Sequence, residues 1–226
     1  MCSRYCLTSP PEAVRATFGT FNHEEFPPRY NIAPTQPVLI VRNSMRQARE
    51  LVLVRWGLIP SWVKEPQSFT TLINARAETA QEKPSFRASM RHRRCLVPTD
   101  GFYEWTGQKG AKQPHLIRPK GGGLLVMAGI WEHWLGADGS EVETMAILTV
   151  AANRTMQRIH ERMPVILEPD TFEAWLDCRS GSAQYVGELL RPAPEGLLDI
   201  VPVSRALNNP RNEGPDVQAP PALDPN

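Results

Sequence analysis

Two apolar segments, LLVMAGI at residues 124–130 and MAILTV at residues 145–150, decide the fold that this sequence predicts. Each is short and rich in branched or large apolar side chains, which is typical of a buried β-strand. Four more runs have the same character, at residues 37–41, 50–56, 94–97 and 200–203. The sequence therefore predicts a protein built mainly on β-strands.

Helical segments are fewer than strands. Apolar residues at helical spacing, or a capping residue at the start, predict helices at residues 11–18, 153–160, 168–177 and 182–190. Because the strands do not alternate regularly with these helices, a doubly wound parallel sheet is disfavoured. We expect a single α+β domain, residues 1–207, with a curved, mainly antiparallel, barrel-like sheet flanked by short helices. Residues 208–226 hold five prolines and few apolar residues, which predicts an irregular C-terminal tail.

The composition leaves the class of function open. The chain has 226 residues, 41% of them hydrophobic, and its formal net charge of +1 does not indicate a nucleic-acid partner. Its four cysteines contain no CxxC pair, so neither a metal centre nor a disulfide framework is expected. No apolar run approaches the ~20 residues of a membrane span, and the first residues lack a secretory signal. We expect free thiols in a reducing cytoplasm and no association with a membrane.

Residue 2 would carry two nucleophiles once the initiator methionine is removed. Met1 is followed by the small residue Cys2, so its removal leaves a free α-amine beside a thiol. The amine titrates near about 7.7–8 and a free thiol near about 8.5, so both are available close to neutral pH. The amine can form an imine with an aldehyde, and the thiol can then close a five-membered thiazolidine ring. A chance Met-Cys start is the alternative.

Two short motifs carry polar groups suited to a reactive site. In LINARAET, residues 72–79, the residues Asn74, Arg76 and Glu78 alternate, so an extended chain would place them on one side. A solvated strand face gives the same pattern, but an amide beside a guanidinium fork also suits a phosphate-bearing substrate. In GFYEW, residues 101–105, Glu104 lies between two aromatic residues, where partial burial would suit proton transfer. If the aromatic side chains lie on the opposite face, we expect Glu104 to be exposed.

A third motif presents a histidine. RIHERMPVIL, residues 158–167, predicts the end of a helix, a turn at residues 160–164 and a strand, which is a common way to place a residue such as His160 at a site. The remaining histidines are expected to be structural or exposed: His23, His92, His115 and His133.

Aromatic and basic residues recur along the first half of the chain: Arg4, Arg29, Tyr30, Trp56, Trp62, Arg76, Arg87, Arg91, Arg93 and Arg94. This mixture suits single-stranded nucleic acid, because bases stack on aromatic rings while guanidinium groups hold phosphates. We expect Trp56 and Trp105 to support the fold, and Trp62, in a Pro-Ser-Trp turn, to be an exposed platform.

Six separated motifs resemble the SOS response-associated peptidase family in order and spacing. They are MCSRY (1–5), RYNIAPTQ (29–36), RWGLIPSW (55–62), INARAET (73–79), GFYEW (101–105) and IHERMPVIL (159–167). VPVSRALNN at residues 201–209 extends the resemblance over almost the whole chain. The resemblance implies a single mixed α/β domain with a curved, barrel-like sheet and a basic channel for single-stranded DNA that ends at a duplex junction.

The resemblance also implies a reaction, in which the mature N-terminal cysteine forms a thiazolidine crosslink with an abasic site and shields the lesion. Cys2 would be the nucleophile, and Asn74 would orient the N-terminal amine and the sugar. Glu104 would act as acid and base in opening the sugar ring, and His160 would assist proton transfer, including reversal of the crosslink. No cofactor is implied, and we expect a monomer.

Five further residues match positions that bind DNA in the family. Arg4, Arg76 and Arg162 would contact phosphates. Pro34 and Trp62 would line the channel and separate or stack bases.

One departure from the family pattern and two alternative functions remain. The usual MCGRY opening is MCSRY here, with Ser3 in place of a glycine, whose backbone freedom is larger. One alternative is a thiol peptidase with Cys2 as nucleophile, His160 as base and Asn74 or Glu104 as orienting group, whose minimal activity would be removal of Met1. The other is a non-covalent DNA-binding module that recognises junctions by stacking and phosphate contacts.

Overall fold

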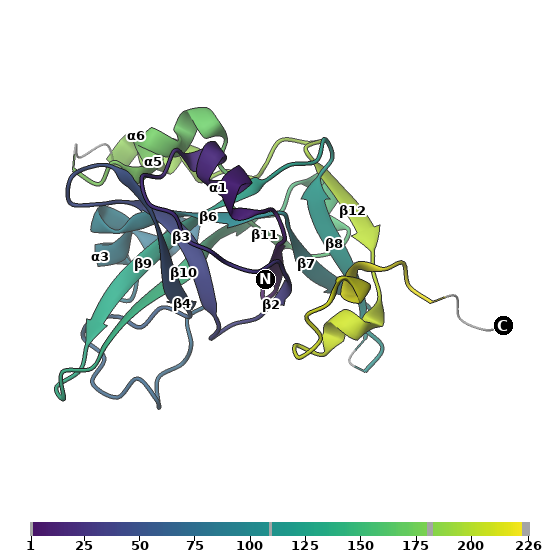
Figure 1. Ribbon diagram of the computed structural model, residues 1–226, viewed down its shortest axis with the longest axis horizontal. Helices are drawn as coiled ribbons and strands as arrows, with labels where there is room; N and C mark the ends of the chain where they lie inside the picture. Colours follow the sequence, from purple (N-terminus) through teal and green to yellow (C-terminus); the bar gives the residue numbers. More distant parts are fainter. Residues whose placement is uncertain (1, 109, 180–182, 223–226) are drawn as a thin grey trace.

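Strand β10 (Glu141–Ala151) closes a five-stranded barrel in the computed structural model, which describes residues 2–108, 110–179 and 183–222 (Figure 1). The other barrel strands are β3 (Pro37–Asn43), β4 (Arg49–Trp56), β6 (Arg94–Thr99) and β9 (Leu125–Leu135). Around the barrel the order is β4-β3-β6-β9-β10, and β10 returns to β4. Only the β10–β4 pair of this ring is parallel. The predicted α+β fold with a curved, mainly antiparallel sheet is confirmed.

A second sheet lies beside the barrel and contains the first strand of the chain (Figure 1). Its antiparallel order is β12 (Leu198–Pro202), β8 (Gln113–Pro119), β7 (Gly101–Thr106), β1 (Tyr5–Leu7) and β2 (Arg29–Ile32). One face, with Phe102 and Ile117, joins the main apolar core, whereas the other, with Tyr103 and Leu116, forms a smaller core. A polar side chain on either face is therefore held close to apolar neighbours.

Two three-residue strands extend β10 beyond the barrel. β5 (Asn74–Arg76) runs parallel to residues Ile147–Thr149 of β10, and β11 (Arg162–Pro164) pairs antiparallel with Thr149–Ala151. Both strands belong to motifs that the sequence singles out for chemistry. One end of β10 therefore gathers two of the predicted functional segments.

The helices are short, and α1 (Pro11–Phe18), α5 (Phe172–Leu176) and α6 (Ala183–Leu189) lie together over the barrel (Figure 1). The remaining α-helices are α2 (Ala77–Ala80), α3 (Arg87–His92) and α4 (Arg154–Gln157). Three 3-10 helices complete the described elements: η1 (Pro169–Thr171), η2 (Arg205–Asn208) and η3 (Pro215–Gln218). Across the described part of the chain, no helix has the length and apolar character needed to cross a bilayer.

Some predicted boundaries agree with the structure and others were wrong. The helix at residues 11–18 forms as predicted. The helix predicted at residues 153–160 is capped by the Asn153 side chain, which accepts from the Met156 N–H at 2.9 Å, but it already ends at Gln157. LINARAET is not extended throughout, because the chain turns into α2 at Ala77, so Glu78 lies on a helix. The predicted turn at residues 160–164 is shorter, since β11 already begins at Arg162.

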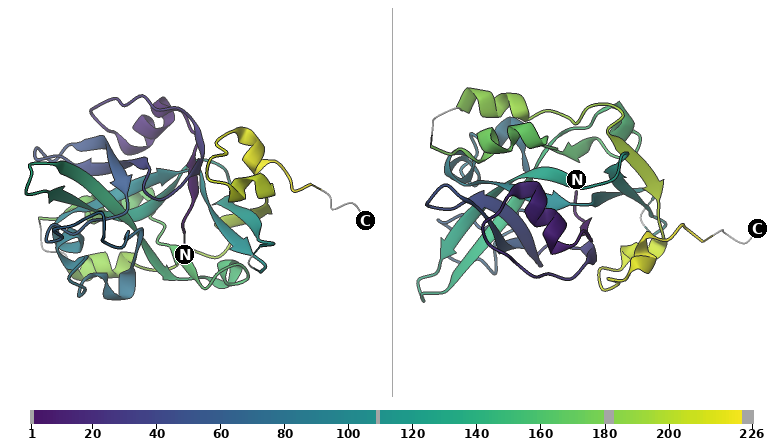
Figure 2. Two further views of the ribbon diagram at one scale, coloured as in Figure 1. Left: turned by 90° about the horizontal axis from the view of Figure 1, so that it is seen from below. Right: turned by 45° about the horizontal axis from the view of Figure 1, so that its top comes forward.

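The C-terminal segment packs on the second sheet as far as Ala219, after which the chain leads away from the domain (Figure 2). Leu207 and Val217 are buried in the smaller core, and the Gln218 amide donates to the Tyr103 hydroxyl at 2.7 Å. The few apolar residues of a proline-rich stretch thus suffice to hold it on the outer face of β7 and β8.

Arg94 ties the ends of two helices to the barrel. It is buried on β6, and its Nε donates to the Trp175 carbonyl at 2.7 Å and its Nη1 to the Met90 carbonyl at 2.8 Å. Its Nη2 donates to the Asp177 carbonyl at 2.5 Å. A cation at helix C-termini satisfies carbonyl groups that have no partner within the helix and interacts favourably with the helix dipole.

Arg94→Ala is expected to lower the free energy of unfolding by about 3 kcal/mol, because three carbonyl groups lose a charged donor. Urea denaturation followed by circular dichroism measures this change. The control is Arg91→Ala on the exposed side of α3, which should change stability by less than about 0.5 kcal/mol. Equal losses in the two variants would contradict the assigned role of Arg94.

Candidate functional site

Cys2 is buried at the start of the second sheet. The Arg4 carbonyl accepts from the Tyr103 N–H at 2.9 Å, and the register of β1 on β7 pairs Tyr5 with Phe102. The chain before β1 therefore runs along β7 towards Glu104. Burial raises the pKa of the Cys2 thiol above its ordinary value, and the negative charge of Glu104 raises it further.

The serine at position 3 fits this backbone without strain. Within the described part of the chain, the non-glycine residues with positive φ are Thr35 and Gln47, so Ser3 keeps a conformation open to any residue. The glycine of the family pattern is not required for the position that Cys2 has here.

Asn74 fixes the backbone of Cys2. Its Nδ2 donates to the Cys2 carbonyl at 2.8 Å, which joins β5 to the N-terminal segment across 72 residues of sequence. Its Oδ1 is buried and accepts no hydrogen bond from a described residue. Since a buried amide oxygen normally has a donor, this atom is available to a substrate group or an amine next to Cys2.

Glu104 is 4% exposed on β7. Tyr103 and Trp105 lie on the opposite face, with the smaller core. For that arrangement we expected an exposed Glu104, and this expectation was wrong. The reason is that its own face turns towards the main core, to which Phe102 and Cys2 belong. The effect of Glu104 on the Cys2 thiol shows that the two groups lie within electrostatic range.

His160 lies just before β11, and its ring is oriented by the backbone. The Arg162 N–H donates to His160 Nδ1 at 2.9 Å. In the tautomer that accepts this hydrogen bond at Nδ1, Nε2 carries the ring proton and is the donor atom. Because β5 and β11 both pair with β10, the structure brings His160 and Asn74 to the same end of that strand.

Arg162 forms a two-pronged ion pair with Glu78. Its Nη1 and Nη2 lie 2.6 and 2.8 Å from the two carboxylate oxygens, and Nη2 also donates to the Thr149 carbonyl at 2.5 Å. The Glu78 side chain is 49% exposed, whereas that of Arg162 is 12% exposed. The guanidinium of Arg162, which we expected to contact a phosphate, is thus bound to a carboxylate. The sequence did not reveal that Glu78 is the partner of Arg162.

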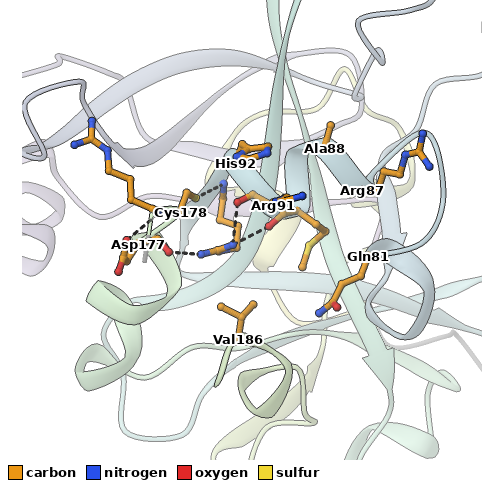
Figure 3. A pocket seen from close by; sticks show the side chains of 11 residues that line it. Gln81, Arg87, Ala88, Arg91, His92, Asp177, Cys178 and Val186 are labelled. Atoms are coloured by element: carbon orange, nitrogen blue, oxygen red, sulfur yellow. Dashed lines mark hydrogen bonds between the residues drawn. The ribbon is translucent and has the colours of Figure 1, made fainter. Parts of the chain in front are cut away.

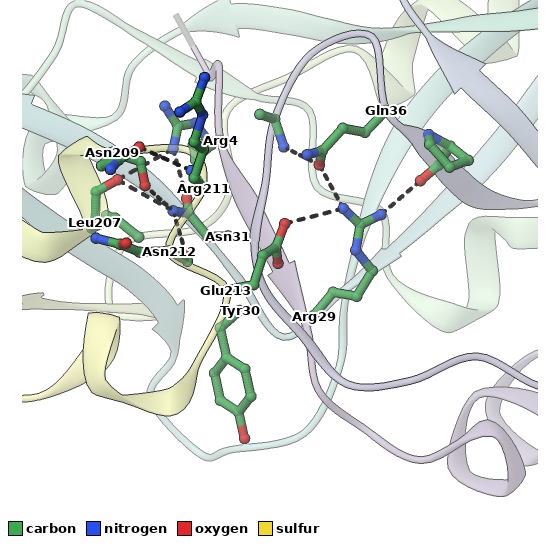
Figure 4. Close-up of polar contacts among 12 residues, drawn as sticks. Arg4, Arg29, Tyr30, Asn31, Gln36, Leu207, Asn209, Arg211, Asn212 and Glu213 are labelled. Carbon is green, nitrogen blue, oxygen red and sulfur yellow. Dashed lines mark hydrogen bonds and ion pairs between the residues drawn. The ribbon is translucent and has the colours of Figure 1, made fainter.

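Arg4 is held by the C-terminal segment (Figure 4). Its Nη1 donates to Asn31 Oδ1 at 2.7 Å and to the Leu207 carbonyl at 3.2 Å. The fully buried Asn31 amide in turn donates to the carbonyls of Asn209 and Asn212 at 3.1 and 2.8 Å. Sequence reasoning missed Asn31, because a single polar residue in a strand gives no signal of four contacts with segments distant in sequence.

The other predicted DNA-binding residues lie at or near the surface. Arg76 is exposed on β5, and Pro34 is half-buried in the turn before β3. Trp62 is 57% exposed and meets the Phe69 ring edge to face at 5.8 Å, so the predicted exposure of Trp62 is confirmed. Trp56 is fully buried, as expected of a residue that supports the fold.

The arginine cluster at residues 87–94 is divided between separate surroundings. Arg87 and Arg91 line a cavity of about 660 Å³ between α3, α5 and α6, together with the buried Arg94 (Figure 3). Arg93 instead pairs with the buried Glu132 at 3.0 Å. None of the described residues around the cavity belongs to the predicted catalytic set, and within the described part of the chain no cluster of His, Cys, Asp or Glu fits a metal ion.

Known proteins resemble this chain over nearly its whole length. The model of the family described as SOS response associated peptidase (SRAP) matches residues 1–210. Abasic site processing protein YoqW of Bacillus subtilis (strain 168) is 37% identical over 221 residues, covering 96% of this chain and 98% of that protein. Abasic site processing protein HMCES of Xenopus tropicalis is 32% identical over 263 residues, covering 97% and 78%. A crystal structure of a protein from Bacteroides thetaiotaomicron has a TM-score of 0.86 at 29% identity, covering 98% and 100%.

Glu78→Gln is expected to lower the free energy of unfolding at pH 7 by about 0.5–1 kcal/mol, a modest loss because water screens the half-exposed carboxylate. The hydrogen bonds from Arg162 lower the pKa of Glu78 in the folded protein. The stabilisation is therefore present above the ordinary glutamate pKa of about 4.3 and is lost as the pH falls through the lowered value. Urea denaturation between pH 3 and 7 tests this, with exposed Glu82→Gln as control; a loss that does not depend on pH would exclude the ion pair as its cause.

Proposed function

Because the chain belongs to the SOS response-associated peptidase family, we propose that it processes abasic sites in DNA by bonding covalently to the sugar aldehyde through Cys2. Relatives at 32–37% identity carry the name abasic site processing protein. The observation that carries the proposal is the 2.8 Å hydrogen bond from Asn74 to the Cys2 carbonyl, beside the buried carboxyl group of Glu104. A terminal residue held in this way can present its amine to a substrate in a fixed orientation.

The proposed reaction begins with removal of Met1 and ring opening of the abasic sugar to its aldehyde. The Cys2 amine adds to C1′, and loss of water gives an imine. The thiol sulfur then bonds to C1′ while its proton passes to the nitrogen, which closes the thiazolidine. Stopping at the imine would allow strand cleavage by elimination, so ring closure decides between protection of the strand and lyase behaviour.

The environment of each group supports its role. A buried thiol with a raised pKa stays protonated at pH 7, so the amine is the first nucleophile and the sulfur needs a base when it attacks. Glu104 is the proposed acid and base for ring opening and for this proton transfer. The Nε2–H of His160 suits a donor that protonates leaving oxygen or, in reversal, the sulfur. The Oδ1 of Asn74, which has no partner among the described residues, would accept from the amine or from a sugar hydroxyl.

The same thiol argues against the peptidase alternative. A thiol peptidase attacks with a thiolate, which an environment that raises the pKa of Cys2 disfavours. We propose that any peptidase-type activity is limited to removal of Met1.

Single-stranded DNA, up to its junction with a duplex, is the proposed substrate. Exposed Arg76 would hold a phosphate and exposed Trp62 would stack a base, with Pro34 beside the strand. Arg162 would contact a phosphate by exchanging Glu78 for it, whereas Arg4 would act from a guanidinium already anchored by Asn31. We expect a monomer that acts in the cytoplasm, next to the nucleoid in a bacterium.

Incubation with single-stranded DNA that carries one abasic site should give a product stable to denaturant, whose mass equals protein without Met1 plus DNA minus water. Cys2→Ala should lose this product while its non-covalent affinity for the DNA changes less than about threefold, because the phosphate contacts remain. Mass spectrometry and filter binding measure the two quantities. Acetylation of the α-amine with the thiol intact should also abolish the product. An adduct that survives acetylation or forms on protein retaining Met1 would overturn the proposal.

Glu104→Gln should slow crosslinking by roughly 10²-fold or more, because the amide keeps the shape of the carboxyl group but transfers no proton. Single-turnover rates on the same DNA measure the effect. Glu141→Gln, at an exposed position on β10, is the matched control and should keep the wild-type rate. An unchanged rate in Glu104→Gln would remove Glu104 from the mechanism.

A further inference from the structure

His115 lies directly opposite Glu104. In the antiparallel pair of β7 and β8 the register sets Glu104 against His115, just as Phe102 is set against Ile117. Phe102 and Ile117 both point into the main core, so Glu104 and His115, two residues away on each strand, share that face. Side chains paired in this way have Cβ atoms roughly 5 Å apart. The histidine that we expected to be structural or exposed is thus the cross-strand neighbour of the proposed acid.

One nitrogen of the His115 ring is poorly satisfied by its surroundings. Its Nδ1 is buried and makes no well-formed hydrogen bond with a described residue, although the Gln113 backbone lies close enough to the ring to act as a weak hydrogen-bond partner. Burial lowers the pKa of His115 below its ordinary value, with a smaller opposing effect of the Gln113 backbone, so the ring is neutral at pH 7. A buried ring nitrogen without a well-formed hydrogen bond is uncommon in a side chain that serves only packing.

Few other charges face this ring. On its own strand the residues that share its face are Gln113 and Ile117, and β12 places Pro202 opposite it and Ile200 next along. η2, which also packs on β8, has an exposed charge at Arg205. Among the described residues of these elements, Glu104 is therefore the ionisable group directly opposite His115, and the Cys2 thiol beyond it is kept uncharged at pH 7 by its raised pKa.

Building on the proposed function, we propose that His115 is a positioning residue for the reaction, which controls across the strand pair whether Glu104 holds its proton. A neutral imidazole adds no positive charge opposite the Glu104 carboxyl group, so the group can act as an acid. Once the ring gains a proton in mild acid, its positive charge favours the ionised carboxylate, and the supply of protons for sugar ring opening falls. The site therefore works with His115 neutral and is slowed by its protonation.

The test is the pH dependence of crosslinking to single-stranded DNA with one abasic site, measured as single-turnover rates from pH 5 to 8. The variant is His115→Phe, which keeps a planar ring without a titrating nitrogen, and the control is His133→Phe at an exposed position on β9. The rate ratio of His115→Phe to wild type should be near one at pH 8 and rise to roughly three- to tenfold at pH 5, because the protonated ring is present opposite Glu104 in wild type alone. His133→Phe should follow wild type. Coinciding profiles of His115→Phe and wild type would overturn the inference.

A second measurement needs no change at His115. The pKa of its ring, followed by NMR, should fall in Glu104→Gln, because the carboxylate that favours the protonated ring is gone. An unchanged ring pKa would overturn the inference even if His115→Phe does not fold. Wild-type protein that gives no denaturant-stable product at any pH would instead overturn the proposed function itself.

Discussion

The backbone pairing of β10 beyond the barrel is the constraint on which the candidate site depends. Thr149 is paired on one side with Arg76 of β5 and on the other with Pro164 of β11. Neighbouring strands lie about 4.8 Å apart, so β5, which carries Asn74, and β11, which follows His160 by two residues, are only two such spacings apart. Neither β5 nor β11 has enough residues to be stable alone. Their positions are fixed by pairing with the long, buried β10. A stable barrel is therefore needed to hold the site residues in place.

The cations of this chain show why net charge says little about its partners. Arg94 is used to cap helices, Arg93 neutralises Glu132, and Arg42 bridges Glu50 and Glu143. Such side chains contribute to the formal charge but present little of it to a ligand. In the proposed function, recognition of a phosphate backbone would then depend on the few arginines that remain exposed, such as Arg76, and on exchange of Glu78 for a phosphate at Arg162.

The long elements were predictable from sequence and the site was not. Apolar runs in the sequence predict β3, β4, β9 and β10, because each of these strands buries enough side chains to give a clear local pattern. Three-residue strands such as β1 and β5 exist only because a distant partner offers a free edge, and no local pattern encodes that partner. The motifs supplied the residue types, but the hydrogen bond between Asn74 and Cys2 spans 72 residues of sequence. Glu78 was misassigned for the same reason, since the helix that begins at Ala77 turns it towards Arg162.

The raised pKa of the Cys2 thiol determines the order of events at the proposed centre. A thiolate would compete with the amine for the aldehyde and would give a reversible hemithioacetal, whereas a protonated thiol waits until the imine has formed. In the proposed reaction the imine nitrogen would take the thiol proton through Glu104, so closure of the ring would require no net gain or loss of protons. Burial of the sulfur is therefore compatible with its use as a nucleophile, provided that the carboxyl group beside it can both give and take a proton. The burial that disfavours a thiolate at Cys2 is thus compatible with the proposed role of its thiol in the second, ring-closing step.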